Sequence, residues 1–503
     1  MPYDYDPNHS EPLTPPKPLN HTERLTKLTA IVKLCRSLDS VAYAVYRIGG
    51  DGVSIIPVQH SMFRDWLAGL FFAKYEMPPD DRPLRKVIRS LNAYAVNYIH
   101  RVPVHLRVGA SDRNIVLGLM NRTGEMVEIA RDGWRVVSGD SHMFHLGLAA
   151  AALPTPVQPD DPVAALNKLR AILNLTSGPD WTRCLIWLLN ALWPLGPYPI
   201  LALTGIPGCG KSTTARLLRT LIDPSRTPLF MLPRSERDLL DHTRHSWVPT
   251  FDHVSQIPNR ILETLASIAT GSGLKRTANY DCTDGHHLDI HRPIILALEH
   301  DVRPDVINKL RPRMCNVALS PLTPQTRRID EQIQAEFENN HPEILGALCT
   351  ALCTAMDKID QIKLETPCRF AGAVARALAA APALGLTPEA ILEAANESPY
   401  RPDDPVLKAV WHFAHEQPGW EGTSTEFLEA IRPRWNRAFP DNPYGLSCYV
   451  RKAQAHLETA GVQLAFSKSR GITRIRVGLS SPTDLPGQNQ PNGINELPGA
   501  PAN

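Results

Sequence analysis

The sequence predicts a multidomain α/β protein, and three observations support this. At 503 residues the chain is too long for one ordinary hydrophobic core. An apolar run, Ile200–Thr204, leads directly into a glycine-rich loop and a helical pattern, and further strands and helices alternate after it. Polar or proline-rich stretches separate regions of different pattern. The expected segments are a disordered tail (1–20), an N-terminal α+β domain (21–152), a P-loop core with a parallel sheet (162–320), a helical segment (321–400), a winged-helix domain (404–478) and a second disordered tail (479–503).

Composition narrows the class of protein. The chain is 43% hydrophobic and 21% charged, with a formal net charge of +2, so any nucleic-acid surface must be local. Nine cysteines include no Cys-x-x-Cys pair, which favours a reducing, cytoplasmic setting over a disulfide framework or structural zinc. We find no secretory signal. The apolar stretch Cys184–Leu203 is interrupted by three prolines and is expected to form a buried helix and strand, not a membrane span.

The N-terminal domain shows alternating strand and helix signals. Val41–Arg47 and Val53–Val58 flank a Gly-Gly-Asp-Gly turn and predict a hairpin. Helical periodicity covers Ser61–Tyr75 and Pro83–His100. Short strands are expected near Val104–Val108, Ile115–Met120, Met126–Ala130 and Trp134–Val137. No cluster of catalytic residue types stands out, so the sequence leaves the role of this domain open.

The core begins with two expected helices, Val163–Leu175 and Asp180–Trp193. Alternation of strands and helices predicts a mainly parallel sheet that is covered on both faces. Its expected strands are Ile200–Thr204, Leu229–Leu232, Val248–Asp252, Ile294–Leu298 and Asn316–Leu319. The alanine-rich segment that follows is expected to be helical, with breaks at Pro342 and Pro382.

The central motif has the form G-x-x-x-x-G-K-[ST] and joins the first core strand to a helix. Its residues are Gly205, Ile206, Pro207, Gly208, Cys209, Gly210, Lys211 and Ser212, and Thr213 follows. This context predicts a P-loop that binds ATP and Mg²⁺. Backbone N–H groups and the helix N-terminus face the phosphates. Lys211 supplies charge to the β- and γ-phosphates, and the Ser212 hydroxyl binds the metal.

A second acidic group is expected at the end of a neighbouring strand, where it holds the water shell of the metal. Asp252 ends the run Trp247–Asp252 and fits this role, although it could instead start a turn. Pro249 removes one ladder N–H from this run. The residue that orients the attacking water could be Asp252 itself, His253 or Glu299, and the sequence does not choose between them.

A turn signal at Asp284-Gly285 separates two short strand-like runs and predicts a hairpin. Lys275 and Arg276 begin one arm, and this basic pair could contact a phosphate backbone, or the hairpin could simply be solvated. A zinc site at His286, His287 and His291 with Cys282 has little support.

Three arginines follow the Ile294–Leu298 strand: Arg303, Arg311 and Arg313. In an oligomeric ATPase an arginine here can reach the γ-phosphate of a neighbouring subunit. We take Arg311 and Arg313 as candidates for this role. Surface solvation or an ion pair within the chain is the alternative for each.

The last folded unit has three predicted helices followed by a two-stranded hairpin, which is the order of a winged helix. Its helices are expected near Val406–His415, from Thr423 or Ser424 through Ile431, and at Leu446–Thr459, and its strands at Val462–Ser467 and Thr473–Val477. Between Gly445 and Gly478 there are six basic residues and a single acid, Glu458; the basic residues are Arg451, Lys452, Lys468, Arg470, Arg474 and Arg476. This local excess predicts phosphate contacts; a protein-contact role for the same fold is the alternative.

Together these features resemble superfamily 3 helicase-like P-loop ATPases of phages, plasmids and integrated mobile elements, over roughly residues 40–478. The resemblance rests on the P-loop and on several other stretches. These are Gly196–Pro199, Leu232–Leu239, Phe251-Asp252, Ala269–Gly273, Arg292–Leu296 and Gly419–Thr423.

The resemblance implies an AAA+-type core, a homohexameric ring and DNA in a central channel, with Lys275 and Arg276 near the hairpin that faces this channel. It also implies a possible primase or polymerase partner. The family usually has an asparagine that senses the γ-phosphate just after Arg-Pro-Ile-Ile-Leu, but this chain has Ala297 there. That departure, together with His253, bears on hydrolysis more than on nucleotide binding.

The leading hypothesis is an ATP-dependent DNA helicase or translocase that serves replication of a mobile element. A nucleotide-gated DNA-binding regulator with weak or no unwinding is the alternative, motivated by His253 and Ala297. A small-molecule kinase would also use a P-loop, but the long flanking domains and the basic C-terminal unit argue against it.

Overall fold

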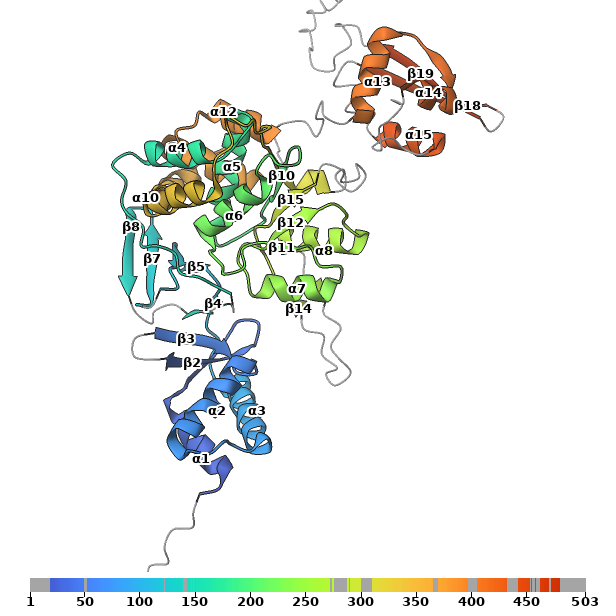
Figure 1. Ribbon diagram of the computed structural model, residues 1–503. Helices are drawn as coiled ribbons and strands as arrows, with labels where there is room; N and C mark the ends of the chain where they lie inside the picture. The colour runs from blue at the N-terminus through green and yellow to red at the C-terminus, as the bar shows by residue number, and fades with distance from the viewer. Residues whose placement is uncertain are drawn as a thin grey trace, which may run out of the picture. The chain divides into compact units, whose positions relative to one another are not determined.

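The computed structural model describes residues 19–48, 52–121, 123–138, 143–145, 147, 149–271, 274–275, 287–288, 290–299, 310–364, 370–396, 405–431, 442–452, 454, 457, 462–469 and 472–479. The chain divides into two compact units (Figure 1). The first contains residues up to Glu299 together with Arg313–Ala394, and the second contains His300–Pro312 and the chain from Ala395 onward.

The first described elements form a helical layer packed on a small sheet. The elements are α1 (His21–Leu28), η1 (Thr29–Ile31), β1 (Lys33–Arg36), β2 (Ala42–Ile48), β3 (Gly52–Pro57), α2 (Ser61–Tyr75) and α3 (Asp81–Tyr98). The strands form an antiparallel sheet in the order β1-β2-β3. Buried Leu25, Leu67, Phe71 and Leu84 join the three helices. The predicted hairpin and both predicted helices are confirmed here.

A second antiparallel sheet follows, with strand order β5-β6-β7-β8. Its strands are β5 (Val108–Ser111), β6 (Asn114–Gly118), β7 (Glu125–Ala130) and β8 (Gly133–Ser138), and β4 (Val104–His105) pairs separately with β9 (Met143–Phe144). The sheet packs against the long helix α10 (Asp330–Lys358). At this contact the Trp134 indole donates to the Thr350 hydroxyl at 3.1 Å.

The central sheet is parallel throughout and has the order β11-β12-β15-β10-β16. Its strands are β10 (Ile200–Thr204), β11 (Phe230–Met231), β12 (Thr250–Val254), β15 (Ile295–Leu298) and β16 (Met314–Ala318). Successive residues of β15 are all buried, and so are the first four of β10. Because neighbouring side chains point to opposite faces, both faces of the sheet are covered, as predicted. Pro249 lies just before β12, so it removes no N–H from within the strand.

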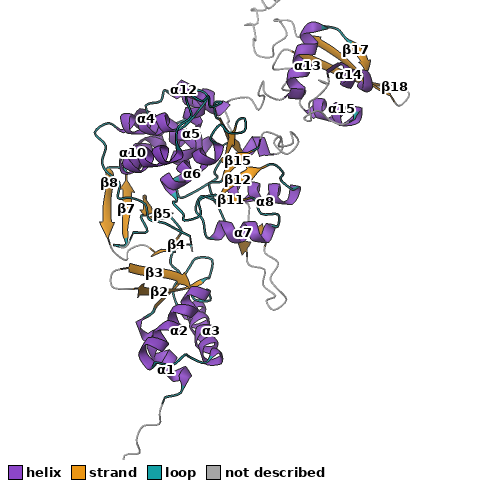
Figure 2. Ribbon diagram, viewed as in Figure 1, coloured by secondary structure: helices purple, strands orange, loops and turns teal. Residues whose placement is uncertain are grey.

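Helices cover this sheet, and some of them pack on further helices to form a bundle (Figure 2). They are α4 (Pro162–Ile172), α5 (Gly178–Ala191), α6 (Lys211–Ile222), α7 (Glu236–Arg244), α8 (Asn259–Thr270), α10, η3 (Ile359–Gln361), α11 (Ala371–Leu384) and α12 (Pro388–Asn396). α6 packs on β12 and β15, α5 packs on β16, and α10 packs on both α4 and α11.

The predicted helix breaks at Pro342 and Pro382 are wrong, because α10 and α11 each continue through their proline. An internal proline removes one backbone donor and strains the preceding turn. The buried face of α10, which includes Ile344, Leu348 and Leu352, continues past Pro342. We attribute the continuity of the helix to the burial of this face.

A buried ion pair joins the N-terminal part to the P-loop helix. Arg107 lies just before β5, and its Nε is 3.1 Å from Asp223 Oδ1, just after α6. The two side chains are 1% and 9% exposed. The second carboxylate oxygen accepts from the backbone N–H groups of Trp247 at 2.9 Å and Val248 at 3.0 Å. Asp223 therefore ties the N-terminal sheet and the approach to β12 to the end of α6.

Arg107 and Arg219 both act on the Asp223 carboxyl. Burial by itself raises the pKa of Asp223, but the charges of Arg107 and Arg219 outweigh it and hold the pKa below its ordinary value. The other guanidinium nitrogens of Arg107 donate to the carbonyls of Gly118 at 3.2 Å and Ala151 at 2.9 Å. The charge is thus fully partnered inside the protein.

The predicted basic hairpin is present at its base, where β13 (Leu274–Lys275) pairs antiparallel with β14 (His287–Leu288). Lys275 lies opposite His287 in this ladder. Arg276 and the turn at Asp284-Gly285 lie outside the described residues.

The second unit is a small α/β fold with its own core. Its elements are α13 (Pro405–Glu416), β17 (Glu421–Thr423), α14 (Ser424–Ile431), α15 (Pro443–Lys452), β18 (Val462–Ser469) and β19 (Ile472–Leu479). The sheet is antiparallel with the order β17-β19-β18. Val410, Phe427, Val450 and Ile475 are buried together. The three helices and the hairpin agree with the prediction, and β17 adds a third strand that the sequence did not mark.

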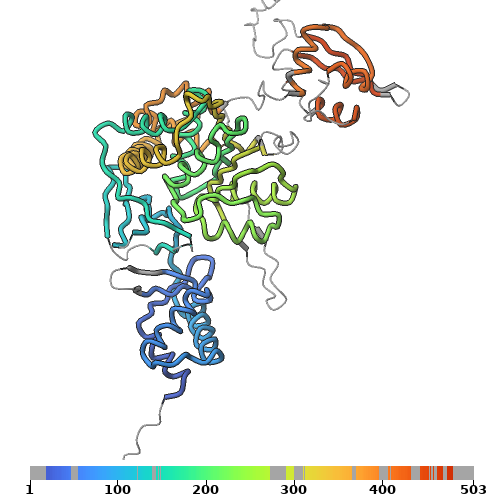
Figure 3. Tube along the Cα trace, in the orientation of Figure 1, coloured from blue at the N-terminus to red at the C-terminus, as the bar shows by residue number. Residues whose placement is uncertain are grey.

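Among the described helices, none is both long and apolar enough to cross a membrane. Figure 3 follows the chain through both units.

We predict that Asp223→Asn destabilises the first unit by about 3–5 kcal/mol, because it leaves the Arg107 charge buried without a counter-charge. Urea unfolding followed by tryptophan fluorescence measures this. The control is Arg131→Ala, which breaks the exposed 2.7 Å pair with Asp360 and should cost at most about 1 kcal/mol. Equal losses in the two variants would contradict the assigned role of the buried pair.

The same pair gives a pH dependence. Because the folded-state pKa of Asp223 is depressed, its contribution is complete above the unfolded carboxyl pKa of about 3.9. It is lost as the pH falls through the lower folded-state value. Acid unfolding of the wild type should therefore show a loss of stability below about pH 4 that is smaller in Asp223→Asn.

Candidate nucleotide site

The glycine-rich loop between β10 and α6 adopts a backbone that only glycines accommodate well. Gly205, Gly208 and Gly210 have φ angles of +152°, +79° and +91°. A Cβ on Gly205 would lie 2.6 Å from Cys209 Sγ and 3.0 Å from the Leu319 carbonyl oxygen. Residues with a side chain would therefore strain or displace the loop. The first N–H groups of α6 have no partners within the helix. Together with the N–H groups of the loop, they are suited to bind the oxygens of a phosphate group.

Lys211 begins α6, and its ammonium group is held over the loop. Its Nζ donates to the Gly205 carbonyl at 2.9 Å and to the Ile206 carbonyl at 3.2 Å. The residue is only 9% exposed. Ser212 follows in the first turn of the helix and is half-buried. These two side chains fit the parts expected of them, which are the phosphate contact and the Mg²⁺ ligand.

Asn174, which the sequence did not mark, supports the loop from outside. Its amide nitrogen donates to the Cys209 carbonyl at 3.1 Å and to the Ser320 carbonyl at 2.6 Å. It thereby links the P-loop to the segment after β16. Asparagine near a helix end is too common to signal such a contact, so only tertiary structure reveals it.

Asp252 and His253 form a bulge in β12 at the carboxyl edge of the sheet. Phe251 pairs with Leu296 and Val254 with Leu298, so two residues of β12 lie opposite Ala297 alone. His253 has φ +52°, which is rare for a residue with a side chain. β15 lies between β12 and β10, so the bulge is about 10 Å across the sheet from the P-loop strand.

The three groups that the sequence could not choose between come together at this edge. His253 Nδ1 lies 2.7 Å from Glu299 Oε1, and His253 Nε2 lies 3.7 Å from Asp252 Oδ2. The Asp252 carboxylate is 12% exposed and also accepts the backbone N–H of His253 at 2.9 Å. One imidazole thus lies between two carboxylates.

The hydrogen bond to Glu299, followed by the charge of Asp252, raises the pKa of His253 above its ordinary value of 6.5. The positive charge of Lys211 opposes this rise. Lys211 is therefore close enough to His253 for the two charges to interact. The P-loop and the bulge both lie at the carboxyl edge of the central sheet, on either side of β15.

Ala297 is 1% exposed in β15, paired with Leu203 of the P-loop strand. It lies between the P-loop strand and the bulge, where the resemblance implies an asparagine. Its methyl group offers no hydrogen bond to a phosphate oxygen. The nearest polar group further along the chain is Glu299, whose backbone N–H donates to the Val254 carbonyl at 2.9 Å.

Arg327 is a second residue that the sequence did not mark. A Cβ built on Gly208 would lie 3.5 Å from Arg327 Nη2, so the guanidinium group lies against the phosphate loop. Arg327 is exposed, and within the described part of the chain its side chain has no ion-pair partner. The adjacent Arg328 instead pairs with Glu336. The loop that brings Arg327 here carries no recognisable motif.

Of the predicted arginines after β15, the structure describes Arg311 and Arg313. Arg313 immediately precedes β16, whose first residue pairs with Ile200. It is therefore at the amino edge of the sheet, opposite the carboxyl edge that carries the P-loop. Arg311 is in the same short helix, η2 (Arg311–Arg313), and Arg303 lies outside the described residues, as does Arg276.

In the second unit, the structure describes part of the predicted basic set. Arg451 is exposed, with its guanidinium carbon 4.6 Å from the centre of the Phe466 ring. Arg474 is 55% exposed and lies 3.9 Å from Glu421, an acid that reduces the local excess of positive charge. Lys452 ends α15 and Lys468 lies in β18, while Arg470 lies outside the described residues.

Within the described residues, no group of three or more His, Cys, Asp or Glu side chains could hold a metal ion. Cys282 and His286 of the weakly supported zinc hypothesis lie outside those residues.

Two protein-family models match the chain. Residues 166–386 match the actinomycete integrative conjugative element replication protein, and residues 406–484 match the C-terminal domain of the same replication protein. Over more than half of its length, the chain matches the replication proteins of actinomycete integrative conjugative elements. This agrees with the expectation of a replication protein from an integrated mobile element. The matched segments include the P-loop, the bulge and the whole described basic set of the second unit.

Solved structures with a similar arrangement are distant. SCCmec type IV Cch, described as an active helicase, is 13% identical with a TM-score of 0.43, over 89% of this chain and 93% of that chain. The C-terminal region of NrS-1 is 11% identical with a TM-score of 0.37, over 91% and 98% of the two chains. Likeness at this level supports no inference about activity. No curated protein matches the sequence significantly.

We predict that the His253 ring titrates above its ordinary value and that Glu299→Gln lowers its pKa, because the substitution removes the charge that stabilises the imidazolium. Histidine-ring NMR measures both, with the resonance assigned by its loss in His253→Gln. His415, whose Nδ1 contacts only the Trp411 carbonyl in the described structure, is the internal control. An unchanged His253 pKa in Glu299→Gln would contradict the contact.

Proposed function

We propose that this protein is an ATP- and Mg²⁺-dependent DNA helicase or translocase of the superfamily 3 type, acting in replication of an integrative element. The observation that carries the proposal is the phosphate loop with Lys211, next to the Asp252–His253 bulge. A parallel sheet with its ligand-binding loops at the carboxyl edge is the usual place for a nucleotide. The family match supports the replication role.

In the proposed mechanism, N–H groups of the loop and of the first turn of α6 bind the phosphates of ATP. Lys211 exchanges its contacts with the Gly205 and Ile206 carbonyls for β- and γ-phosphate oxygens. Arg327 adds a second positive charge from the same chain. Ser212, with Asp252 through water, would hold Mg²⁺, which supplies charge neutralisation on the phosphates.

Hydrolysis needs a carboxylate that orients the attacking water. We assign this role to Glu299, because His253 bridges it to Asp252 and fixes its carboxylate at 2.7 Å. Asp252 is then left to the metal. His253 carries positive charge more readily than usual in this setting, which keeps the two carboxylates from repelling each other.

DNA movement is assigned to the basic hairpin and the second unit. Lys275 and Arg276 would contact DNA in a ring channel, and the second unit would act as a winged helix through Arg451, Lys452, Lys468, Arg470 and Arg474. Arg313, and with it Arg311, would act on the γ-phosphate of a neighbour. The position of Arg313 at the amino edge of the sheet supports a role that requires a second subunit.

A second candidate function is a nucleotide-gated DNA-binding regulator. Ala297 favours it, because this buried methyl group cannot form a hydrogen bond with the γ-phosphate, and so cannot couple its presence to a change elsewhere in the protein. Tight ATP binding with turnover no higher than that of Asp252→Ala would support the regulator over the helicase.

We predict that Lys211→Ala abolishes ATP binding, whereas Glu299→Gln retains it and lowers turnover about 100-fold or more, as expected for loss of a water-orienting base. ATP hydrolysis with and without single-stranded DNA measures turnover, and a forked duplex measures unwinding. Wild-type protein that hydrolyses no more ATP than Lys211→Ala under either condition would reject the proposal. Six-fold rings in electron micrographs with ATP and DNA would support the assembly.

We also predict that Arg327→Ala weakens ATP binding about tenfold, because a charge-assisted contact to phosphate is worth roughly 1.5–3 kcal/mol. ATP should lose more affinity than ADP if the contact is to the γ-phosphate. Arg328→Ala is the matched control, since this neighbouring arginine pairs with Glu336. Equal affinities in the two variants would show that Arg327 does not contact the nucleotide.

A further inference from the structure

Helix α3 carries an unusual concentration of positive charge on its solvent-exposed face. Arg82, Arg85, Lys86 and Arg89 are all exposed, and the only acid of the helix is Asp81. Asp81 reaches Arg85 at 3.9 Å, between two largely exposed side chains. In the described structure Arg82, Lys86 and Arg89 make no hydrogen bond or ion pair. The charges therefore project into solvent almost uncompensated.

This arrangement is unfavourable for the helix by itself. Arg82 and Lys86, and likewise Arg85 and Arg89, are four residues apart, and like charges at this spacing destabilise a helix. Arg82 also lies in the first turn of α3, where the helix dipole favours acids. Both effects reverse when an anion binds, because the positive helix end and the side chains then attract the same charge.

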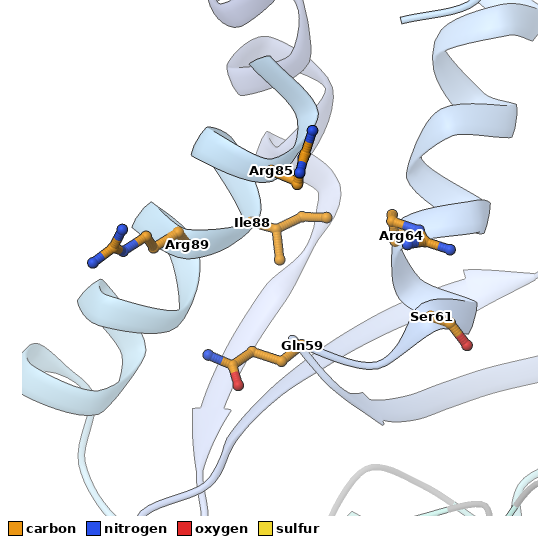
Figure 4. A pocket seen from close by; sticks show the side chains of 6 residues that line it. All are labelled: Gln59, Ser61, Arg64, Arg85, Ile88 and Arg89. Carbon is orange, nitrogen blue, oxygen red and sulfur yellow. The ribbon is translucent and has the colours of Figure 1, made fainter. Parts of the chain in front are cut away.

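A pocket of about 410 Å³ lies on one side of this face, between α2 and α3. Arg85, Ile88 and Arg89 line it from α3, and Ser61 and Arg64 line it from α2, with Gln59 just before α2 (Figure 4). Arg85 and Arg89 extend in different directions from α3, with Ile88 between them. Three guanidinium groups, a hydroxyl and an amide are suitable donors for phosphate oxygens.

A smaller pocket of about 220 Å³ lies on the other side of α3, toward α1. Lys86, Ser90 and Tyr94 contribute to it from α3, and Thr22 and Thr26 from α1. At 100° per residue, the α3 residues that line the two pockets fall on opposite sides of the helix. The exposed face with Arg82 and Arg89 lies between them. Further along, Tyr94 and Tyr98 are 53% and 75% exposed and stack on each other.

We propose that α3 is a duplex-DNA-binding helix that enters the major groove, with backbone phosphates of the two strands bound at the two flanking pockets. An α-helix of about 10–12 Å diameter fits a groove about 12 Å wide. The phosphate walls of that groove then lie on both sides of the helix, where the pockets are. Ala93 and Asn97, which are exposed on the same side of α3 as Arg82 and Arg89, then face base edges. This site is separate from the second unit and from the nucleotide site.

The test uses the full-length protein and the double variant Arg85→Ala/Arg89→Ala. Binding to a labelled duplex of about two helical turns is followed by fluorescence anisotropy between 50 and 200 mM salt. We expect affinity to fall about 10- to 100-fold, and the slope of log affinity against log salt to become shallower by about one per lost phosphate contact. Arg85→Lys/Arg89→Lys should retain most of the binding, because it keeps the charge.

The matched control is Arg113→Ala/Arg131→Ala, which removes two exposed arginines elsewhere in the first unit and should leave duplex affinity unchanged. Because Arg85 and Arg89 are exposed, thermal unfolding of the test variant should match that of the wild type. As a second readout, duplex RNA should compete poorly for the α3-dependent part of binding, since its deep, narrow major groove does not admit a helix.

Wild-type affinity and salt slope in Arg85→Ala/Arg89→Ala would overturn the proposal, as would equal competition by duplex RNA. The outcome is independent of the nucleotide proposal, because duplex binding is measured in the absence of ATP and Mg²⁺. Arg451→Ala/Arg474→Ala reports separately on the second unit. Additive losses from the two pairs would support two distinct DNA contacts, and loss from Arg451→Ala/Arg474→Ala alone would reject the one on α3.

Discussion

The buried pair of Arg107 and Asp223 is the contact on which the arrangement of the first unit depends. Asp223 ends the P-loop helix, and through the N–H groups of Trp247 and Val248 it also fixes the approach to the acidic strand. Arg107 comes from the N-terminal sheet and is almost completely enclosed. Because both charges are removed from water, the loss of either partner would leave the other buried without a counter-charge. One carboxylate thus joins the end of the P-loop helix, the segment before the bulged strand and the N-terminal sheet.

Most of the central fold follows from sequence, and the reasons are physical. Ile200–Thr204 is apolar throughout because both faces of a parallel strand are buried, and the glycines at 205, 208 and 210 are needed wherever φ is positive. Asn174 and Arg327 could not be predicted, because each reaches the loop through tertiary contacts that leave no periodic or spaced pattern. The predicted helix break at Pro342 was wrong, because burial of the long apolar face of α10 outweighs the local cost of a proline inside the helix.

Positive charge in this chain is concentrated on a few surfaces. The net charge of +2 hides two concentrated regions, one on α3 and one in the second unit. Arg474 is partly compensated by Glu421, whereas the α3 residues have almost no acidic neighbours. The nucleotide site shows the opposite arrangement, with His253 held between two carboxylates beside Lys211. A near-neutral composition is therefore compatible with strongly basic surfaces and with a site of closely paired opposite charges.

The bulge in β12 has a consequence for comparing this chain with distant relatives. Residues of a strand alternate between faces. The extra residue of the bulge therefore shifts this alternation by one position along the sequence, and Phe251 and Val254 face the same side although they are three residues apart. A relative with a regular strand here would be one residue shorter between the positions of Phe251 and Val254. A gapless alignment would then match chemically unrelated positions at the carboxyl edge. A histidine or an alanine that looks like a lost catalytic group can be a change of register instead, and superposed backbones distinguish the two cases where aligned letters cannot.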